Sequence, residues 1–232
     1  PGERYEGLVR DSWDYEQATE RKFPQFNGKL LPNPEAFEKP IHWKRPRVIF
    51  VCSMSDPFHE KVPKEWFDRL METVKKAKQH TFLFLTKRPE NIPEGFADGM
   101  EHVWVGVTAE NQAMADKRIP TVLDRLRDDP DGDPWLKTFV SCEPLLGPID
   151  LSAWATDLKW IIVGGESGPS FRPMQEDWVR MLRGAAQMRV RPISFHYKQD
   201  AGVRPNKLPM LDGKVWDERP DFWSKSERQD SL

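Results

Sequence analysis

The sequence predicts an α/β protein built on a parallel β-sheet, and three observations predict this class. Six short apolar runs, rich in β-branched and aromatic residues, have the length of buried strands. Their hydrophobicity is near-continuous rather than alternating, which is typical of strands covered on both faces. Successive runs start 21 to 35 residues apart, which leaves room for a helix in most of the gaps. This alternation suits either a barrel or a doubly wound sheet.

The predicted elements follow one another through the middle of the chain. One predicted helix begins at Pro63 and keeps apolar residues at helical spacing through Lys78. Another begins at about Glu176, and a third covers residues 112–127, where Pro120 predicts a split into two pieces. The predicted strands are residues 48–53 (VIFVCS), 81–86 (TFLFLT), 103–108 (VWVGVT), 138–142 (TFVSC), 159–164 (KWIIVG) and 192–197 (PISFHY).

The two ends of the chain differ from this middle part. Residues 1–47 contain several prolines and scattered aromatic residues without a clear period, so we expect an irregular segment that covers the body. Residues 48–201 carry the strands and form the predicted body. Residues 202–232 are polar but include Trp216 and Trp223, which predicts a C-terminal extension packed on the body.

The composition argues against several classes of protein. The 232 residues carry 35 Lys and Arg against 37 Asp and Glu, so the chain as a whole is not a basic nucleic-acid binder. No apolar stretch approaches the roughly 18 residues that a membrane-spanning helix needs. Two cysteines cannot form a disulfide framework, and the amino end does not resemble a signal peptide. We therefore expect a cytoplasmic protein without a membrane partner.

Charged and polar residues follow every predicted strand. In parallel α/β barrels, the residues at the carboxyl ends of the strands carry the chemistry. Converging carboxylates and cations suit a polar metabolite that bears both ammonium and carboxylate groups. The alternative is a set of ion pairs that only close this end of the sheet. The residues are Ser53, Ser55, Asp56, Lys87, Arg88, Glu110, Asn111, Glu143, Glu166, Lys198 and Gln199.

Other residues carry weaker signals. His59 lies three residues after Asp56, where it is a metal ligand, a base or a hydrogen-bonded loop residue. Neither His-x-His nor His-Glu-x-x-His spacing occurs, so the sequence gives only weak support for an all-protein zinc or two-metal hydrolase site, and no metal ligand is assigned within this chain. The glycine-rich run GGESG (164–168) either lets a ligand approach the backbone or relieves a sharp strand exit. Cys52 and Cys142 lie in predicted strands, so we expect buried thiols.

Several segments resemble a known family in both sequence and order. They are FVCSMSDPFH (50–59), LTKRP (85–89), WVGVTAEN (104–111), SCEPLLG (141–147), VGGESG (163–168) and YKQ (197–199). Together they resemble the phage- and prophage-associated family of radical-SAM-like proteins of unknown function, over about residues 4–220. The resemblance implies a partial TIM-type (β/α) barrel, in which this chain holds six parallel strands and lacks the first strand.

The resemblance also implies cofactors. The family is similar to enzymes that use S-adenosylmethionine (SAM) and a four-iron, four-sulfur cluster, which three closely spaced cysteines ligate. In the family those cysteines precede the segment at which this chain begins, so we expect the cluster only if they exist upstream. The expected SAM contacts are Ser53, Ser55 or Asp56 for the amino group, Glu110 or Asn111 for the ribose, and Lys87 and Glu143 for the carboxylate, the adenine or the substrate.

The implied function is hydrogen abstraction by a 5′-deoxyadenosyl radical from an unidentified substrate, with a reductant protein as partner. A phage setting suits a nucleobase, nucleotide or nucleic-acid substrate. Two alternatives stay open: a barrel without the cluster that binds a ligand or a protein, and a metal-assisted hydrolase. The hydrolase would use Asp56, His59, Glu110 and Glu143, and the candidates for substrate contact are Arg88, Glu166, Lys198, Gln199 and His59.

Overall fold

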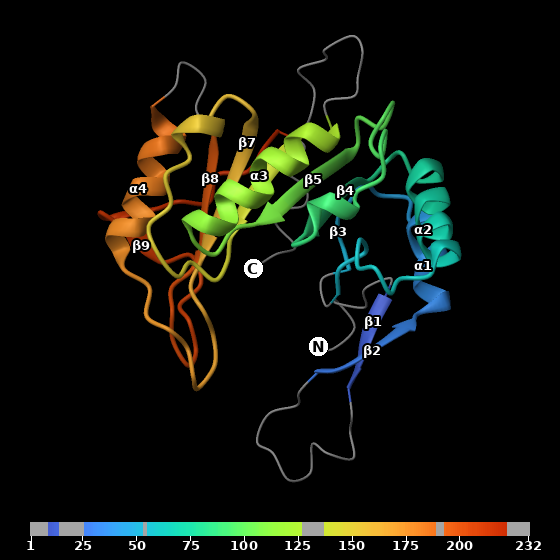
Figure 1. Ribbon diagram of the computed structural model, residues 1–232, viewed down its shortest axis with the longest axis horizontal. Coiled ribbons are helices and arrows are strands. Elements are labelled where there is room, and N and C mark those ends of the chain that lie inside the picture. Colours follow the sequence, from blue (N-terminus) through green and yellow to red (C-terminus); the bar gives the residue numbers. More distant parts are fainter. Residues whose placement is uncertain (1–8, 14–25, 53–54, 127–136, 189–192, 222–232) are drawn as a thin grey trace. The chain divides into compact units, whose positions relative to one another are not determined.

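A computed structural model describes residues 9–13, 26–52, 55–126, 137–188 and 193–221 (Figure 1). Within these residues, six strands form a sheet in the order β3-β4-β5-β6-β7-β8. This order repeats the order of the sequence and lacks the reversal that marks a doubly wound sheet. The predicted class, a partial (β/α) barrel, is confirmed. The strands are β3 (Val48–Val51), β4 (Thr81–Thr86), β5 (Val103–Thr108), β6 (Thr138–Cys142), β7 (Leu158–Gly164) and β8 (Ser194–Gln199).

The strand predictions differ from the structure only at the ends. The predicted bounds of β4, β5 and β6 are confirmed, and β7 begins one residue earlier than expected. β3 ends at Val51 because Cys52 has a φ of 55°, which no extended strand adopts. β8 runs two residues further than predicted, to Gln199, and the predicted start at Pro192 lies outside the described residues.

Helices lie in three of the five gaps between these strands, in agreement with the prediction of a helix in most of them. They are α2 (Lys64–Lys76), α3 (Gln112–Leu126) and α4 (Glu176–Gln187), with short 3-10 turns η3 (Pro89–Asn91) and η4 (Ser152–Trp154). Pro63 precedes α2 rather than opening it. The expected break at Pro120 is wrong, because α3 is continuous. Pro120 is exposed, whereas Ile119 and Val122 beside it are buried, so burial of this face stabilises the helix across the proline.

The first 47 residues contain more regular structure than their prolines predict. β1 (Val9–Trp13) and β2 (Phe26–Pro32) form an antiparallel hairpin, and helix α1 (Pro34–His42) follows. Pro32 ends β2, and Pro34 lies in the first turn of α1, where a helix needs no backbone N–H donor. The expectation of an irregular segment is therefore wrong for the described part of these residues.

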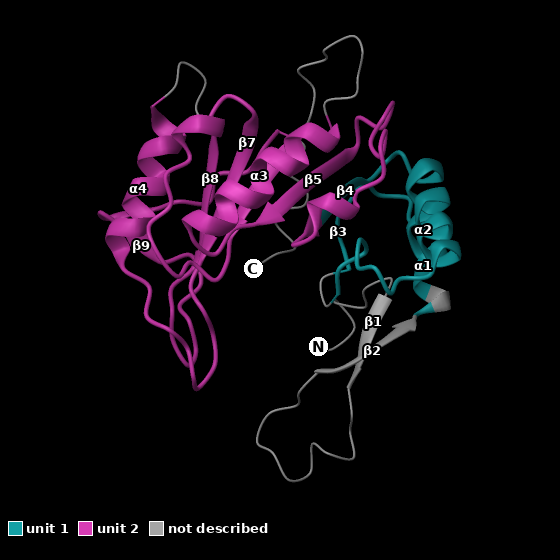
Figure 2. Ribbon diagram, in the orientation of Figure 1, with its two compact units in different colours: residues 1–84 teal, residues 85–232 magenta. Residues whose placement is uncertain are grey.

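The chain divides into two compact units, residues 1–84 and 85–232 (Figure 2). The first unit, called unit 1, contains β1, β2, α1, β3, α2 and most of β4; its core includes Phe37, Val74 and Phe82. The second, called unit 2, contains the end of β4 and all later elements; its core includes Phe139 and Phe195. The predicted division into residues 1–47, 48–201 and 202–232 stays a prediction.

Residues near the C-terminus pair with β8. A short hairpin of β9 (Met210–Leu211) and β10 (Lys214–Val215) leads into this segment. The Tyr197 N–H donates to the Trp216 carbonyl oxygen at 2.8 Å, and His196 Nδ1 lies 2.8 Å from Asp217 Oδ1. Trp216 is buried, while Trp223 lies outside the described residues. This pairing covers the backbone edge that β8 would otherwise expose.

Candidate ligand site at the strand ends of unit 2

Glu110 follows β5, and its carboxylate lies between two cations. Lys87 Nζ donates to Oε1 at 2.5 Å, and Arg118 Nη1 donates to Oε2 at 2.7 Å. Arg118 comes from α3 and also donates to the Thr108 carbonyl oxygen at 2.8 Å. The Arg118 and Glu110 side chains are only 12% and 13% exposed. Both carboxylate oxygens are therefore held in fixed positions at the end of the strand.

These contacts control the charge of Glu110. Burial alone would raise its pKa. The hydrogen bond from Lys87, a backbone hydrogen bond and the positive charges of Arg118 and Lys87 outweigh burial, so the pKa of Glu110 is lowered. At neutral pH Glu110 is consequently an ionised hydrogen-bond acceptor and not a proton donor.

Glu143 follows β6 at the register position equivalent to Glu110. Thr108 pairs with Ser141 in the parallel ladder, and each glutamate lies two residues beyond its member of this pair. Lys198 Nζ donates to Glu143 Oε2 at 2.7 Å, and Ser141 Oγ donates to Oε1 at 3.2 Å. The strand ends of β5 and β6 thus carry two neighbouring carboxylates, each bound to a lysine.

A glycine makes room for the second of these ion pairs. Lys198 belongs to β8, so its bond to Glu143 spans β7, which lies between β6 and β8. A Cβ added to Gly164, the last residue of β7, would lie 2.9 Å from Glu143 Oε2. At the next residue, Gly165, a Cβ would lie 2.4 Å from the Ala201 backbone nitrogen. The two glycines therefore make room for different groups: Gly164 for the Glu143 side chain and Gly165 for the Ala201 backbone.

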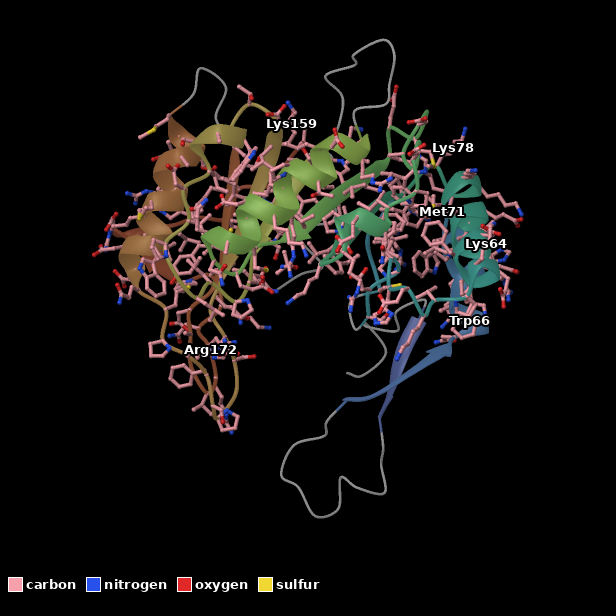
Figure 3. The ribbon with its side chains drawn as sticks, viewed as in Figure 1. Lys64, Trp66, Met71, Lys78, Lys159 and Arg172 are labelled. Carbon is pink, nitrogen blue, oxygen red and sulfur yellow. The ribbon has the colours of Figure 1, made fainter. Side chains whose placement is uncertain are left out.

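Glu166 is bound by an arginine from its own loop. Arg172 donates from Nε to Oε2 at 2.8 Å and from Nη2 to Oε1 at 2.7 Å, and its backbone N–H also donates to Oε2 at 2.8 Å. The Arg172 side-chain and backbone hydrogen bonds lower the pKa of Glu166 to about 2. Arg172 lies on the loop that follows β7 (Figure 3).

Three other predicted residues of unit 2 have local contacts. Asn111 Oδ1 accepts a hydrogen bond from the Met114 N–H at 3.1 Å and so caps the start of α3. Gln199 Nε2 donates to the Gly165 carbonyl oxygen at 2.8 Å, which ties the end of β8 to the loop after β7. The Arg88 backbone N–H donates to Thr86 Oγ1 at 2.9 Å.

The remaining predicted residues belong to unit 1 and follow β3. Asp56 Oδ1 accepts a hydrogen bond from the Phe58 N–H at 3.0 Å. His59 Nδ1 accepts one from the Lys61 N–H at 3.1 Å and lies 3.7 Å from Glu60 Oε2. Ser55 is partly exposed in the same segment, and Ser53 lies outside the described residues. Of the predicted residues, the structure thus brings together Lys87 with Glu110, and Glu143 with Lys198, in unit 2.

Cys52 and Cys142 are buried, as expected. Burial, together with the charges of Glu143 and Glu110, raises the pKa of the Cys142 thiol. Among the residues that the structure describes, no group of three or more His, Cys, Asp and Glu side chains could hold a metal ion. In the same residues, no helix is long and apolar enough to cross a membrane.

Sequence reasoning missed two arginines of this site. Arg118 lies eight residues after Glu110, and most of that interval is the start of α3. Arg118 lies seven residues, about two helical turns, after the capping residue Asn111, so both are on one side of α3, and this spacing was a usable signal. Arg172 pairs with Glu166 across an irregular loop, for which the sequence holds no periodic signal.

The fold places the protein in the partial (β/α) barrel class. The ion pairs give unit 2 a cluster of charged side chains at its strand ends. Residues 6–220 match the model of a family described as "Protein of unknown function (DUF5131)". The chain belongs to this family. No curated protein and no solved structure matches the chain.

Proposed function

We propose that the strand ends of unit 2 bind SAM and that the chain forms the barrel body of a radical-SAM-like enzyme, which abstracts hydrogen from its substrate. The proposal rests on one observation. The strand ends of unit 2 carry charged residues of both signs, which form ion pairs between Lys87 and Glu110 and between Lys198 and Glu143. SAM bears an ammonium, a carboxylate and a sulfonium group, so it needs acceptors and cations side by side. The family-like motifs at the same positions support this choice.

The contacts indicate a division of roles. Glu110 is ionised and fixed by Arg118, so it would accept hydrogen bonds from the ribose hydroxyls. Asn111 already uses Oδ1 to cap α3, so its amide nitrogen would donate to a ribose oxygen. Lys87 would contact the SAM carboxylate. SAM, when bound, supplies the group that abstracts hydrogen, while these residues orient it and exclude water.

The residues of this chain do not fit the iron–sulfur cluster of such enzymes. A cluster needs several converging thiolates, whereas Cys52 and Cys142 are both buried, and burial raises the pKa of Cys142. Thiolate ligands would have to come from outside this sequence. The reductant partner, the nucleotide or nucleic-acid substrate and the cytoplasmic location belong to the same proposal and rest on the resemblance described above.

Equilibrium dialysis with radiolabelled SAM tests the proposal. We expect saturable binding to the wild type. Glu110→Gln removes a charged acceptor, so we expect it to bind SAM at least about tenfold more weakly. Glu101→Gln is the matched control, because Glu101 is exposed and precedes β5, at the opposite end of that strand. The proposal is wrong if the wild type does not bind SAM, or if Glu110→Gln binds as tightly as Glu101→Gln.

A second measurement separates the proposal from a ligand-binding barrel without the cluster. The full-length gene product, reconstituted anaerobically with iron and sulfide, is expected to be brown and to cleave SAM when a reductant is added. Binding of SAM by a colourless protein that never cleaves it would favour the ligand-binding barrel.

A further inference from the structure

Three ion pairs at the strand ends of unit 2 share one arrangement, in which the cation faces outward and the carboxylate is covered. In each pair the cation is at least half exposed, and the carboxylate lies beneath it. The exposed fractions of the side chains are 50% and 13% for Lys87 and Glu110, 52% and 19% for Lys198 and Glu143, and 60% and 26% for Arg172 and Glu166. A ligand that reaches these strand ends therefore meets ammonium and guanidinium groups first.

The arrangement is not shared by the ion pairs on α4 of the same unit. There the carboxylate is the more exposed partner: Arg180 is 37% exposed against 83% for Asp177, and Arg183 is 20% exposed against 43% for Asp212. Ordinary surface pairs of this chain can thus turn the acid outward. Lys117 is also more exposed than its partner Glu90, but that carboxylate is 49% exposed, so an outward cation over a carboxylate at most 26% exposed distinguishes the strand-end pairs.

The local structure also holds these cations in place before any ligand arrives. Arg172 makes three hydrogen bonds to Glu166, two from its guanidinium and one from its backbone. Lys198 is held by Glu143, whose own position depends on the space left at Gly164. Side chains that are ordered in advance lose little conformational entropy when a ligand binds.

From these observations we propose that Lys198 and Arg172 bind an oxyanion of the substrate, a phosphate or a carboxylate group, beside the SAM carboxylate at Lys87. An oxyanion can add to these cations without breaking the ion pairs, whereas an ammonium group would have to displace a lysine from its carboxylate. Each pair is neutral overall, so the attraction acts at short range on a group that reaches the site. The inference rests on the proposed function for the location of the site and extends it to the class of substrate.

Isothermal titration calorimetry with two probes tests the inference: inorganic pyrophosphate and malonate, a dicarboxylate. We expect the wild type to bind at least one of them. Lys198→Gln and Arg172→Gln should each bind it about tenfold more weakly, because each removes one charge-assisted hydrogen bond. These side chains are at least half exposed, so the variants should keep the wild-type thermal midpoint. Preference for pyrophosphate identifies a phosphate substrate, and preference for malonate a carboxylate.

Lys159→Gln is the matched control. Lys159 is exposed near the amino end of β7, and Figure 3 shows it at the opposite end of this strand from Arg172. Binding that falls equally in Lys159→Gln and in Lys198→Gln would indicate nonspecific attraction and overturn the inference. Failure of both probes to bind the wild type would do the same.

Dialysis with SAM on the same samples separates the two proposals. Binding of SAM without binding of either oxyanion overturns only the substrate inference. Binding of an oxyanion without SAM overturns only the SAM proposal.

Discussion

Replacing Gly164 by alanine should move the Glu143 carboxylate while leaving the fold of unit 2 almost unchanged. The added Cβ would lie 2.9 Å from Glu143 Oε2 and 3.1 Å from its Cγ and Cδ atoms. These distances are shorter than van der Waals contact, so the flexible glutamate side chain must shift. The shift would break its 2.7 Å ion pair with Lys198.

The expected loss of stability is small, because Lys198 in this ion pair is half exposed and such pairs contribute about 0–1 kcal/mol. Substitutions of two other glycines provide a comparison for this loss of stability. Gly165→Ala would place a Cβ 2.4 Å from the Ala201 backbone nitrogen, which cannot move without the chain, so we expect a loss of about 1–3 kcal/mol. Gly184→Ala meets nothing within 4 Å on α4 and should stabilise by about 0.5–1 kcal/mol.

Urea denaturation and calorimetry with pyrophosphate measure the two effects separately. For Gly164→Ala we expect a free energy of unfolding within about 1 kcal/mol of the wild type and a pyrophosphate affinity about tenfold lower. Gly184→Ala should keep the wild-type affinity. A Gly164→Ala protein with unchanged affinity, or one destabilised as strongly as Gly165→Ala, would refute the reasoning.

Four further predictions concern charge and thiol chemistry. The pKa of Glu110, which burial raises but Lys87 and Arg118 lower more strongly, should rise in Arg118→Gln when followed by carboxyl-carbon NMR. In the wild type the lowered pKa of Glu110 stabilises the fold at pH values above the ordinary pKa of 4.5. This contribution is lost as the pH falls through the folded pKa. The free energy of unfolding of Glu110→Gln should therefore fall less in acid than that of the wild type. The pKa of Glu166 should return from about 2 toward 4.5 in Arg172→Gln, and an unchanged value would contradict their pairing. Burial raises the pKa of the Cys142 thiol, so iodoacetamide should label it only after unfolding, and rapid labelling of the native protein would contradict that burial.

The strands could be predicted because their signal is local. Runs such as residues 103–108 are apolar over the whole length of a strand, and all six residues of β5 are buried. The continuity of α3 could not be predicted in the same way. Pro120 is a local signal against a helix, and the burial of Ile119 and Val122, which overrides it, depends on residues far away in the sequence.

The site was predictable as a set of charges but not as a set of contacts. The strand-end rule identified Glu110 and Glu143 as candidates, because parallel strands bring their carboxyl ends to one edge. Which cation each carboxylate binds depends on side-chain direction. The bond from Lys198 across β7 needs the space at Gly164, which only the three-dimensional structure shows. The exposed fractions of the side chains, which show that the cations face outward, likewise come only from the three-dimensional structure.

Hydrogen–deuterium exchange with and without SAM tests the central claim most directly, because it locates the ligand as well as detecting it. We expect SAM to slow exchange in the segments that follow the strands of unit 2, namely residues 86–88, 109–111, 143–146 and 164–168. The amino end of β7, around Lys159, should exchange at the same rate in both samples. No change in the four segments, or protection confined to the amino ends of the strands, would contradict the account.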